Sequence, residues 1–169
     1  MDLLERLLGH DQWTTGELLR RCEELTPAQI DQEFDIGWRT VRRTLAHMIS
    51  NERTWTDLMN GLDAAHSTDG WFEFNVGELS AAHEMAYQDL AELARSMDTN
   101  GRWNDTFVDT LDSPPQTKSL GGGVLHVITH NMHHRSEVLH ILDRLGLTDL
   151  PEGDMLGWEQ LQTVQKGAV

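Results

Sequence analysis

Five of the nine histidines in this 169-residue chain fall between residues 126 and 140. On an α-helix, residues four apart lie one turn apart on the same face, so His126 and His130, or His130 and His134, can reach one ion together. Neutral imidazole nitrogens bind zinc and related divalent transition metals, and catalytic sites often combine three protein ligands with an open position. The spacing therefore predicts either a transition-metal site on this segment or a polar helix face whose histidines contact water or one another.

A third ligand must come from a facing helix. His47 is the natural donor, because it lies among apolar residues near the middle of another predicted helix. His126, His133 and His140 are competing ligands. His126 shares the stripe of His130, whereas His133 projects about 100° around the helix from its neighbour His134. Spacing alone leaves the choice among these histidines open.

The helices that must position these side chains follow from the periodicity of apolar residues. This periodicity predicts long helices over residues 2–25, 41–62 and 76–97, and a fourth that begins after Gly121, Gly122 and Gly123 and ends at Gly146. We also expect a short helical turn over 26–31, a loop over 64–75, a small hairpin within 102–120 and a C-terminal helix over 155–164. Helices of matched length predict an all-α four-helix bundle with a small β-hairpin before its fourth helix, as a single domain over residues 1–169.

The composition excludes several classes of partner. The chain has 13 Lys and Arg against 28 Asp and Glu, a formal net charge of -15, which disfavours binding to nucleic acid. No apolar stretch approaches the ~20 residues that cross a membrane. The single cysteine, Cys22, cannot form an intrachain disulfide and is expected to be a half-buried helix residue. We therefore expect a cytoplasmic protein with neither a membrane nor a nucleic-acid partner.

Three segments, HVITHNMHHRSEVL, LAHMISNERTW and HDQWTTGELL, together resemble the DinB/YfiT-like superfamily of metalloenzymes over nearly the whole chain. The resemblance rests on the H-x3-H-R signature and on a histidine in the second long helix. It implies that His47, His130 and His134 hold one nickel or zinc ion, and that Arg135 is the arginine following the last ligand. The chain reads Ser136 and Glu137 where the family often has Gly followed by Gln or Glu.

The same resemblance implies a function. Relatives are similar to thiol S-transferases and to a thiol-dependent isomerase, so we expect a metal-dependent enzyme that uses a low-molecular-weight thiol and acts on a small electrophile. It also implies a homodimer and a long crossover between the first two long helices. The alternatives are a non-catalytic stress protein that binds metal or a small molecule, and a metal-dependent hydrolase. No catalytic residue is assigned.

Two carboxylates are candidates to hydrogen-bond a ligand imidazole, Glu52 and Glu137, and a solvent-facing position is the alternative for each. The tryptophans could line an apolar pocket near the metal, although tryptophans at helical spacing more often belong to a core. The four considered are Trp13, Trp38, Trp55 and Trp158.

Overall fold

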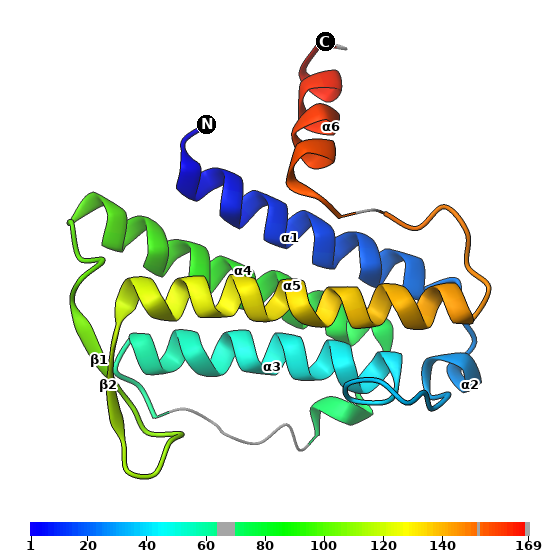
Figure 1. Ribbon diagram of the computed structural model, residues 1–169, viewed down its shortest axis with the longest axis horizontal. Helices are drawn as coiled ribbons and strands as arrows, with labels where there is room; N and C mark the ends of the chain where they lie inside the picture. The colour runs from blue at the N-terminus through cyan, green and yellow to red at the C-terminus, as the bar shows by residue number, and fades with distance from the viewer. Residues whose placement is uncertain (64–69, 152, 168–169) are drawn as a thin grey trace.

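The computed structural model describes residues 1–63, 70–151 and 153–167. Four long helices lie side by side and form the body of the molecule (Figure 1), namely α1 Leu3–Cys22, α3 Val41–Met59, α4 Val76–Thr99 and α5 Leu120–Arg144. Each begins at a polar residue whose side chain accepts a hydrogen bond from the backbone N–H three residues further on, a regular N-cap. These caps are Asp2, Thr40, Asn75 and Ser119. The predicted helical bundle is confirmed.

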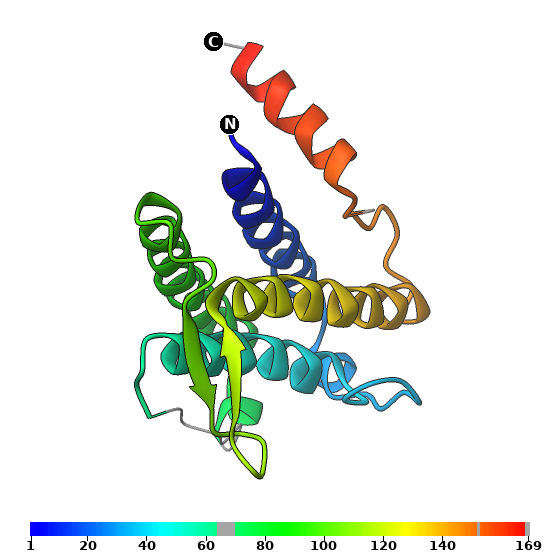
Figure 2. The same cartoon turned by 60° about the vertical axis from the view of Figure 1, so that its left-hand side comes forward.

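Shorter elements complete the chain. The helical turn α2, Pro27–Ile30, follows the N-cap Thr26, and η1, Trp71–Glu73, is a 3₁₀ turn. The predicted loop over 64–75 thus contains a turn in its last part, and residues 64–69 lie outside the described residues. The C-terminal helix α6, Met155–Gly167, runs further than predicted and projects from the bundle in both views (Figures 1 and 2). No helix among the described residues is long and apolar enough to cross a membrane.

The connections between the long helices differ from the expected crossover between α1 and α3. In Figure 1, α1 and α5 run in one direction and α3 and α4 in the other. The connection between α1 and α3 is long, as expected, but it stays at one end of the bundle. The end of α3 and the start of α4 instead lie at opposite ends of the bundle, because these two helices are parallel.

The predicted hairpin is present between α4 and α5. Strand β1, Thr106–Asp109, pairs antiparallel with β2, Gln116–Ser119, with Phe107 opposite Lys118. Phe107 is buried and meets the ring of Trp55 edge-on, at 6.2 Å between centroids. The hairpin thereby covers one end of the bundle (Figure 2).

The predicted start of the last long helix is wrong. Helix α5 begins at Leu120, and the three glycines form its first turn instead of preceding it. A Cβ at Gly121 would lie 3.0 Å from the backbone oxygen of Trp103, and one at Gly123 would lie 2.5 Å from Met59 Sδ. The glycines therefore allow α5 to pack closely against its neighbours, and the chain does not bend there.

The bundle core consists of two apolar clusters, one at each end, with polar side chains between them. The first cluster includes Leu19, Leu45 and Ile141, and the second includes Leu8, Leu90 and Val127. Cys22 is fully buried in the first cluster, deeper than expected, and burial raises the pKa of its thiol to about 12. It is therefore unsuited to act as a nucleophile at neutral pH.

Candidate metal centre

Three histidines from two helices converge at the middle of the bundle. His130 Nε2 lies 3.2 Å from His47 Nε2 and 3.2 Å from His134 Nε2. His47 comes from α3, while His130 and His134 are one turn apart on α5. These three residues form a group whose potential ligand atoms all lie within 4.8 Å of one another. The structure thus brings together the three histidines that the family resemblance singled out.

The surroundings of this group keep the imidazoles of His47 and His130 neutral at neutral pH. Burial, and then the neighbouring His134, lower the pKa of His47 to about 4 against the opposing effect of Glu137. Burial, together with repulsion from the surrounding histidines, lowers the pKa of His130 to about 3. Neutral imidazole is the form that binds a metal ion, so these two rings have the charge state that a metal ligand needs.

Two side chains orient the rings of His134 and His130. Glu137 Oε2 accepts a hydrogen bond from His134 Nδ1 at 2.7 Å, which leaves the lone pair of that ring on Nε2, facing the other histidines. The amide of Asn51 lies 3.2 Å from His130 Nδ1. Sequence reasoning identified Glu137 as a candidate but missed Asn51, although Asn51 stands four residues after His47 and therefore on the same face of α3.

The connection before α3 packs against the site. Trp38 stacks on the ring of His47 at 4.4 Å between centroids and with 30° between the planes. Its neighbour Gly37 has a φ of +47°, and a Cβ there would overlap the carboxyl group of Glu137. Only glycine combines this backbone conformation with so close an approach. Trp38 is the tryptophan of the four that contacts this group of histidines, and sequence reasoning gave no role to Gly37.

The competing histidines lie outside this group. His126 is exposed, and its ring lies tilted beside that of His130 at 5.6 Å between centroids and meets the ring of Trp55 edge-on. His133 is exposed and lies 3.3 Å from Glu137 Oε1, so that it forms a second potential metal group with His134 and Glu137. His140 is exposed and belongs to neither group.

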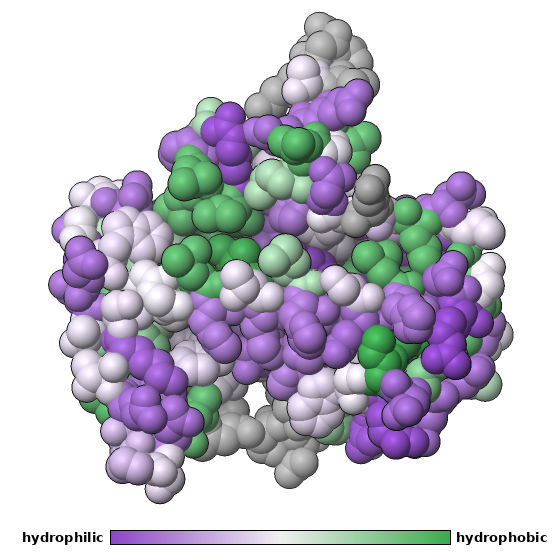
Figure 3. All heavy atoms as spheres, viewed as in Figure 1, coloured by the Kyte–Doolittle hydropathy of each residue, from purple (hydrophilic) through white to green (hydrophobic). Residues whose placement is uncertain are grey.

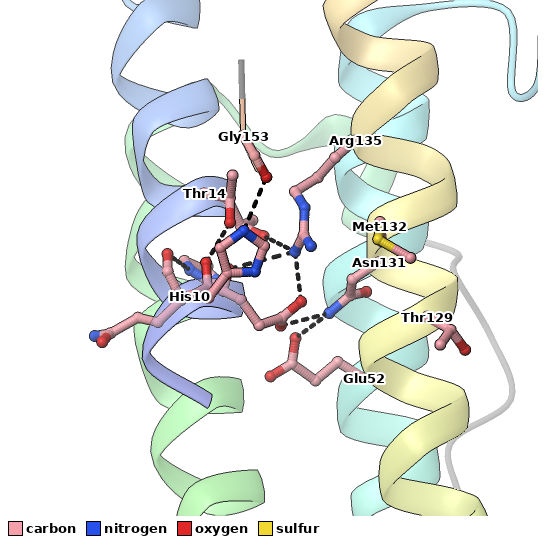
Figure 4. Close-up of polar contacts among 12 residues, drawn as sticks. His10, Thr14, Glu52, Thr129, Asn131, Met132, Arg135 and Gly153 are labelled. Atoms are coloured by element: carbon pink, nitrogen blue, oxygen red, sulfur yellow. Dashed lines mark hydrogen bonds and ion pairs between the residues drawn. The ribbon is translucent and has the colours of Figure 1, made fainter. Parts of the chain in front are cut away.

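Glu52 does not contact a histidine of the group and does not face solvent. It is buried in the polar centre of the bundle, where its Oε2 accepts a hydrogen bond from Asn131 Nδ2 at 3.1 Å (Figure 4). Burial, and then the charge of Asp11, raise its pKa to about 8. Both interpretations of Glu52 from sequence, a hydrogen bond to a ligand imidazole and a solvent-facing position, were wrong. The periodicity of α3 does not reveal a polar partner on another helix.

Comparisons with known proteins agree with this architecture. A DinB-family member from Exiguobacterium sibiricum has a similar crystal structure, with a TM-score of 0.66 and 19% sequence identity, over 89% of this chain and 95% of that one. At this identity the likeness concerns the fold. No curated protein matches the chain. The sequence profile of the DinB family matches residues 1–162, nearly the whole length, and the chain therefore belongs to the DinB family.

Proposed function

We propose that His47, His130 and His134 bind one divalent transition metal, nickel or zinc, and that the chain is a metal-dependent enzyme that uses a small thiol. The observation that carries this proposal is the convergence of three imidazoles: His130 Nε2 lies 3.2 Å from both His47 Nε2 and His134 Nε2, and the ligand atoms of all three residues lie within 4.8 Å of one another. Metal–nitrogen bonds of ~2.0 to 2.1 Å in a tetrahedral arrangement separate two ligand atoms by roughly 3.3 Å. The two separations from His130 Nε2 are close to this value, so the donor set fits such an ion.

The tautomers of the rings also suit this role. Asn51 Nδ2 now faces His130 Nδ1, and in this state the proton of His130 is on Nε2. Turning the Asn51 amide by 180° presents its oxygen to Nδ1–H and leaves Nε2 free for a cation, and the two amide orientations have nearly the same shape. Glu137 already holds His134 in the binding tautomer.

Bound there, the metal would supply a Lewis acid that holds the sulfur of a small thiol as thiolate. The chain's own residues leave one side of the site accessible, because His47 and His130 are only partly buried and Trp38 is 37% exposed. Trp38 and the adjacent Phe72, 5.8 Å apart, provide an apolar wall beside His47 on which a small electrophile can pack.

A metal-dependent hydrolase has less support. It needs a general base beside the metal, and the two carboxylates considered from sequence are both engaged. Glu137 hydrogen-bonds His134, and Glu52 is turned into the bundle core toward Asn131. A protein that only binds metal would use the same ligands, and an activity assay with a thiol and an electrophile distinguishes it from an enzyme.

We also propose that the chain forms a homodimer through α1 and α5. Figure 3 shows apolar side chains gathered where these helices meet the surface. Leu3 is 72% exposed and Leu125 is 54% exposed, and both line an apolar cavity of about 480 Å³. Burial of such a patch against a second copy would remove this apolar area from water.

The test of the enzyme proposal has two parts. Protein purified without added metal is analysed for metal, then incubated with zinc or nickel at neutral pH, and one ion per chain is expected. The loaded protein is next mixed with several low-molecular-weight thiols and a bimane or chloronitrobenzene electrophile. A rate above background that requires both metal and thiol supports the enzyme. Metal binding without such a rate for any of the thiols would favour a non-catalytic metal-binding protein.

A further inference from the structure

Helix α5 carries two pairs of polar residues that are offset by one position. His130 and His134 form one pair, and Asn131 and Arg135 form the other. An offset of one residue is a rotation of about 100°, so the first pair faces α3 while the second faces the centre of the bundle and α1. Asn131 thus directly follows the proposed ligand His130, and Arg135 directly follows the proposed ligand His134. A contact that holds the second pair also sets the direction of the first.

The second pair is held by buried polar contacts from two other helices. Asn131 Nδ2 donates to Asp11 Oδ2 on α1 and to Glu52 Oε2 on α3, both at 3.1 Å. Arg135 forms an ion pair with Asp11 Oδ1 and lies 3.3 Å from Thr15 Oγ1. Figure 4 shows Asn131, Arg135 and Glu52 directed toward this common centre.

These contacts are among the most buried polar interactions of the chain. Asp11, Asn131 and Arg135 are 2%, 1% and 4% exposed. Asn131 and Arg135 are joined directly through the backbone of α5 to the proposed ligands His130 and His134. Buried ion pairs contribute little net stability compared with apolar side chains of similar size, because two charges lose their hydration. Their bonds are directional, however, and therefore depend on the rotation of each helix about its axis.

A small rotation of α5 would disturb the histidines strongly. Side-chain ends lie roughly 5 to 6 Å from a helix axis, so a turn of about 20° moves them by roughly 2 Å. This displacement is as long as a metal–nitrogen bond. An apolar interface between α1 and α5 tolerates such turns more readily than a set of directional hydrogen bonds does.

We infer that Asp11, Asn131 and Arg135 are positioning residues, which lock the rotation of α5 so that His130 and His134 meet His47. The inference rests on the proposed metal site, but it concerns the direction of the imidazoles and not the identity of the ion. Arg135 acts through its neighbour His134, and Asn131 through His130, without touching the metal position themselves.

The test separates positioning from stability. In the double variant Asp11→Leu with Arg135→Met, apolar side chains replace the ion pair, and folding stability is expected to stay close to that of the wild type or to rise. Arg135→Lys, which keeps the charge but loses the planar fork, is the second variant in case the double variant does not fold. The matched control is Arg21→Met, because Arg21 is a similarly buried arginine that bonds the backbone oxygens of Thr148 and Asp149, away from the histidines.

Cobalt(II) affinity, the cobalt absorption spectrum and the imidazole NMR signals of the metal-free protein are measured for each variant. We expect the double variant to lose affinity by about 10- to 100-fold, with an altered spectrum, and Arg135→Lys to show a smaller change in the same direction. The signals of His130 and His134 should shift in both variants and stay unchanged in Arg21→Met. Wild-type affinity, spectrum and imidazole signals in a folded double variant would overturn the inference.

Failure of the proposed function gives a different pattern. If wild-type protein takes up no cobalt, zinc or nickel at these histidines, the metal proposal fails. The imidazole signals of the metal-free protein still decide whether Asp11 and Arg135 set the direction of His130 and His134.

Discussion

His134 Nδ1 lies 2.7 Å from Glu137 Oε2, three residues further along the same helix. One turn of α5 thus contains both a proposed metal ligand and the carboxylate that fixes its tautomer. The carboxyl group in turn lies against Gly37, in the connection that also places Trp38 on His47. Three segments distant in sequence therefore shape one side of the site.

Replacing the proposed ligands should separate them from their competitors. His47→Ala, His130→Ala and His134→Ala should each reduce metal affinity by more than the roughly 10- to 100-fold typical of an outer-sphere partner. His140→Ala should have little effect, and an intermediate loss at His126 or His133 would indicate an outer role. Isothermal titration with zinc measures this, with helicity checked by circular dichroism. Full metal loss in His126→Ala but not in His134→Ala would place the site one turn earlier on α5.

The Gly37 contact predicts a sensitive backbone position. Gly37→Ala places a Cβ at a φ of +47° and against the Glu137 carboxyl group, so that this group must move away from His134 Nδ1. We expect metal affinity to fall by roughly 10-fold, as for Glu137→Gln, because both changes weaken the same outer hydrogen bond. Gly101→Ala is the control, since its φ is +66° but no atom lies near its Cβ. Equal affinities for Gly37→Ala and wild-type protein would contradict this account.

Acid should remove the metal more gradually than ordinary histidines would predict. The pKa values of His47 and His130, lowered to about 4 and about 3, prevent both rings from binding protons between pH 7 and 5. Protons then compete with the metal for at most one of the three proposed ligands, so metal affinity should fall by no more than about tenfold per pH unit. Three imidazoles with a pKa of ~6.5 would give a steeper loss. Zinc titrations at pH 7, 6 and 5 measure the slope. A third-power dependence on proton concentration would show that all three rings titrate together.

Much of this arrangement was accessible from sequence, for identifiable reasons. Apolar periodicity located the long helices, and the spacing of His130 and His134 together with the family resemblance identified the histidines that meet. The start of α5 was missed because Gly121 and Gly123 serve packing against Trp103 and Met59, which sequence spacing does not show. Asn51 was missed because a polar residue on a helix looks the same whether its partner is water or an imidazole.

The dimer proposal predicts a position-dependent loss of association. Leu125→Glu places a charge in the apolar patch between α1 and α5, and a dimer through this face should become a monomer because burial of an unpaired carboxylate is unfavourable. Met85→Glu on α4 is the matched control, since Met85 is also exposed, at 62%, but lies on another helix. Sedimentation velocity of the three proteins measures the masses. A monomeric wild-type protein, or a dimer that Leu125→Glu leaves intact, would argue against this interface.

Glu52 should make the stability of the fold depend on pH. Its pKa is about 8 in the folded protein and near the ordinary 4.5 when unfolded, because burial and the negative Asp11 oppose its ionisation more than Arg135 and Asn131 favour it. Between these values the folded state holds a proton that the unfolded state has released, so the free energy of unfolding falls as pH rises from about 4.5 to 8, by up to about 1.4 kcal/mol per pH unit.

Glu52→Gln imitates the protonated side chain at every pH and should remove this contribution. Urea unfolding at pH 5, 6, 7 and 8 should therefore give a stability difference between variant and wild type that shifts in favour of the variant with increasing pH. Glu92→Gln, at an exposed position on α4, controls for the loss of one carboxylate. If the curves of Glu52→Gln and the wild type stayed parallel throughout this range, Glu52 would already be ionised in the folded core, with Arg135 balancing two carboxylates instead of one.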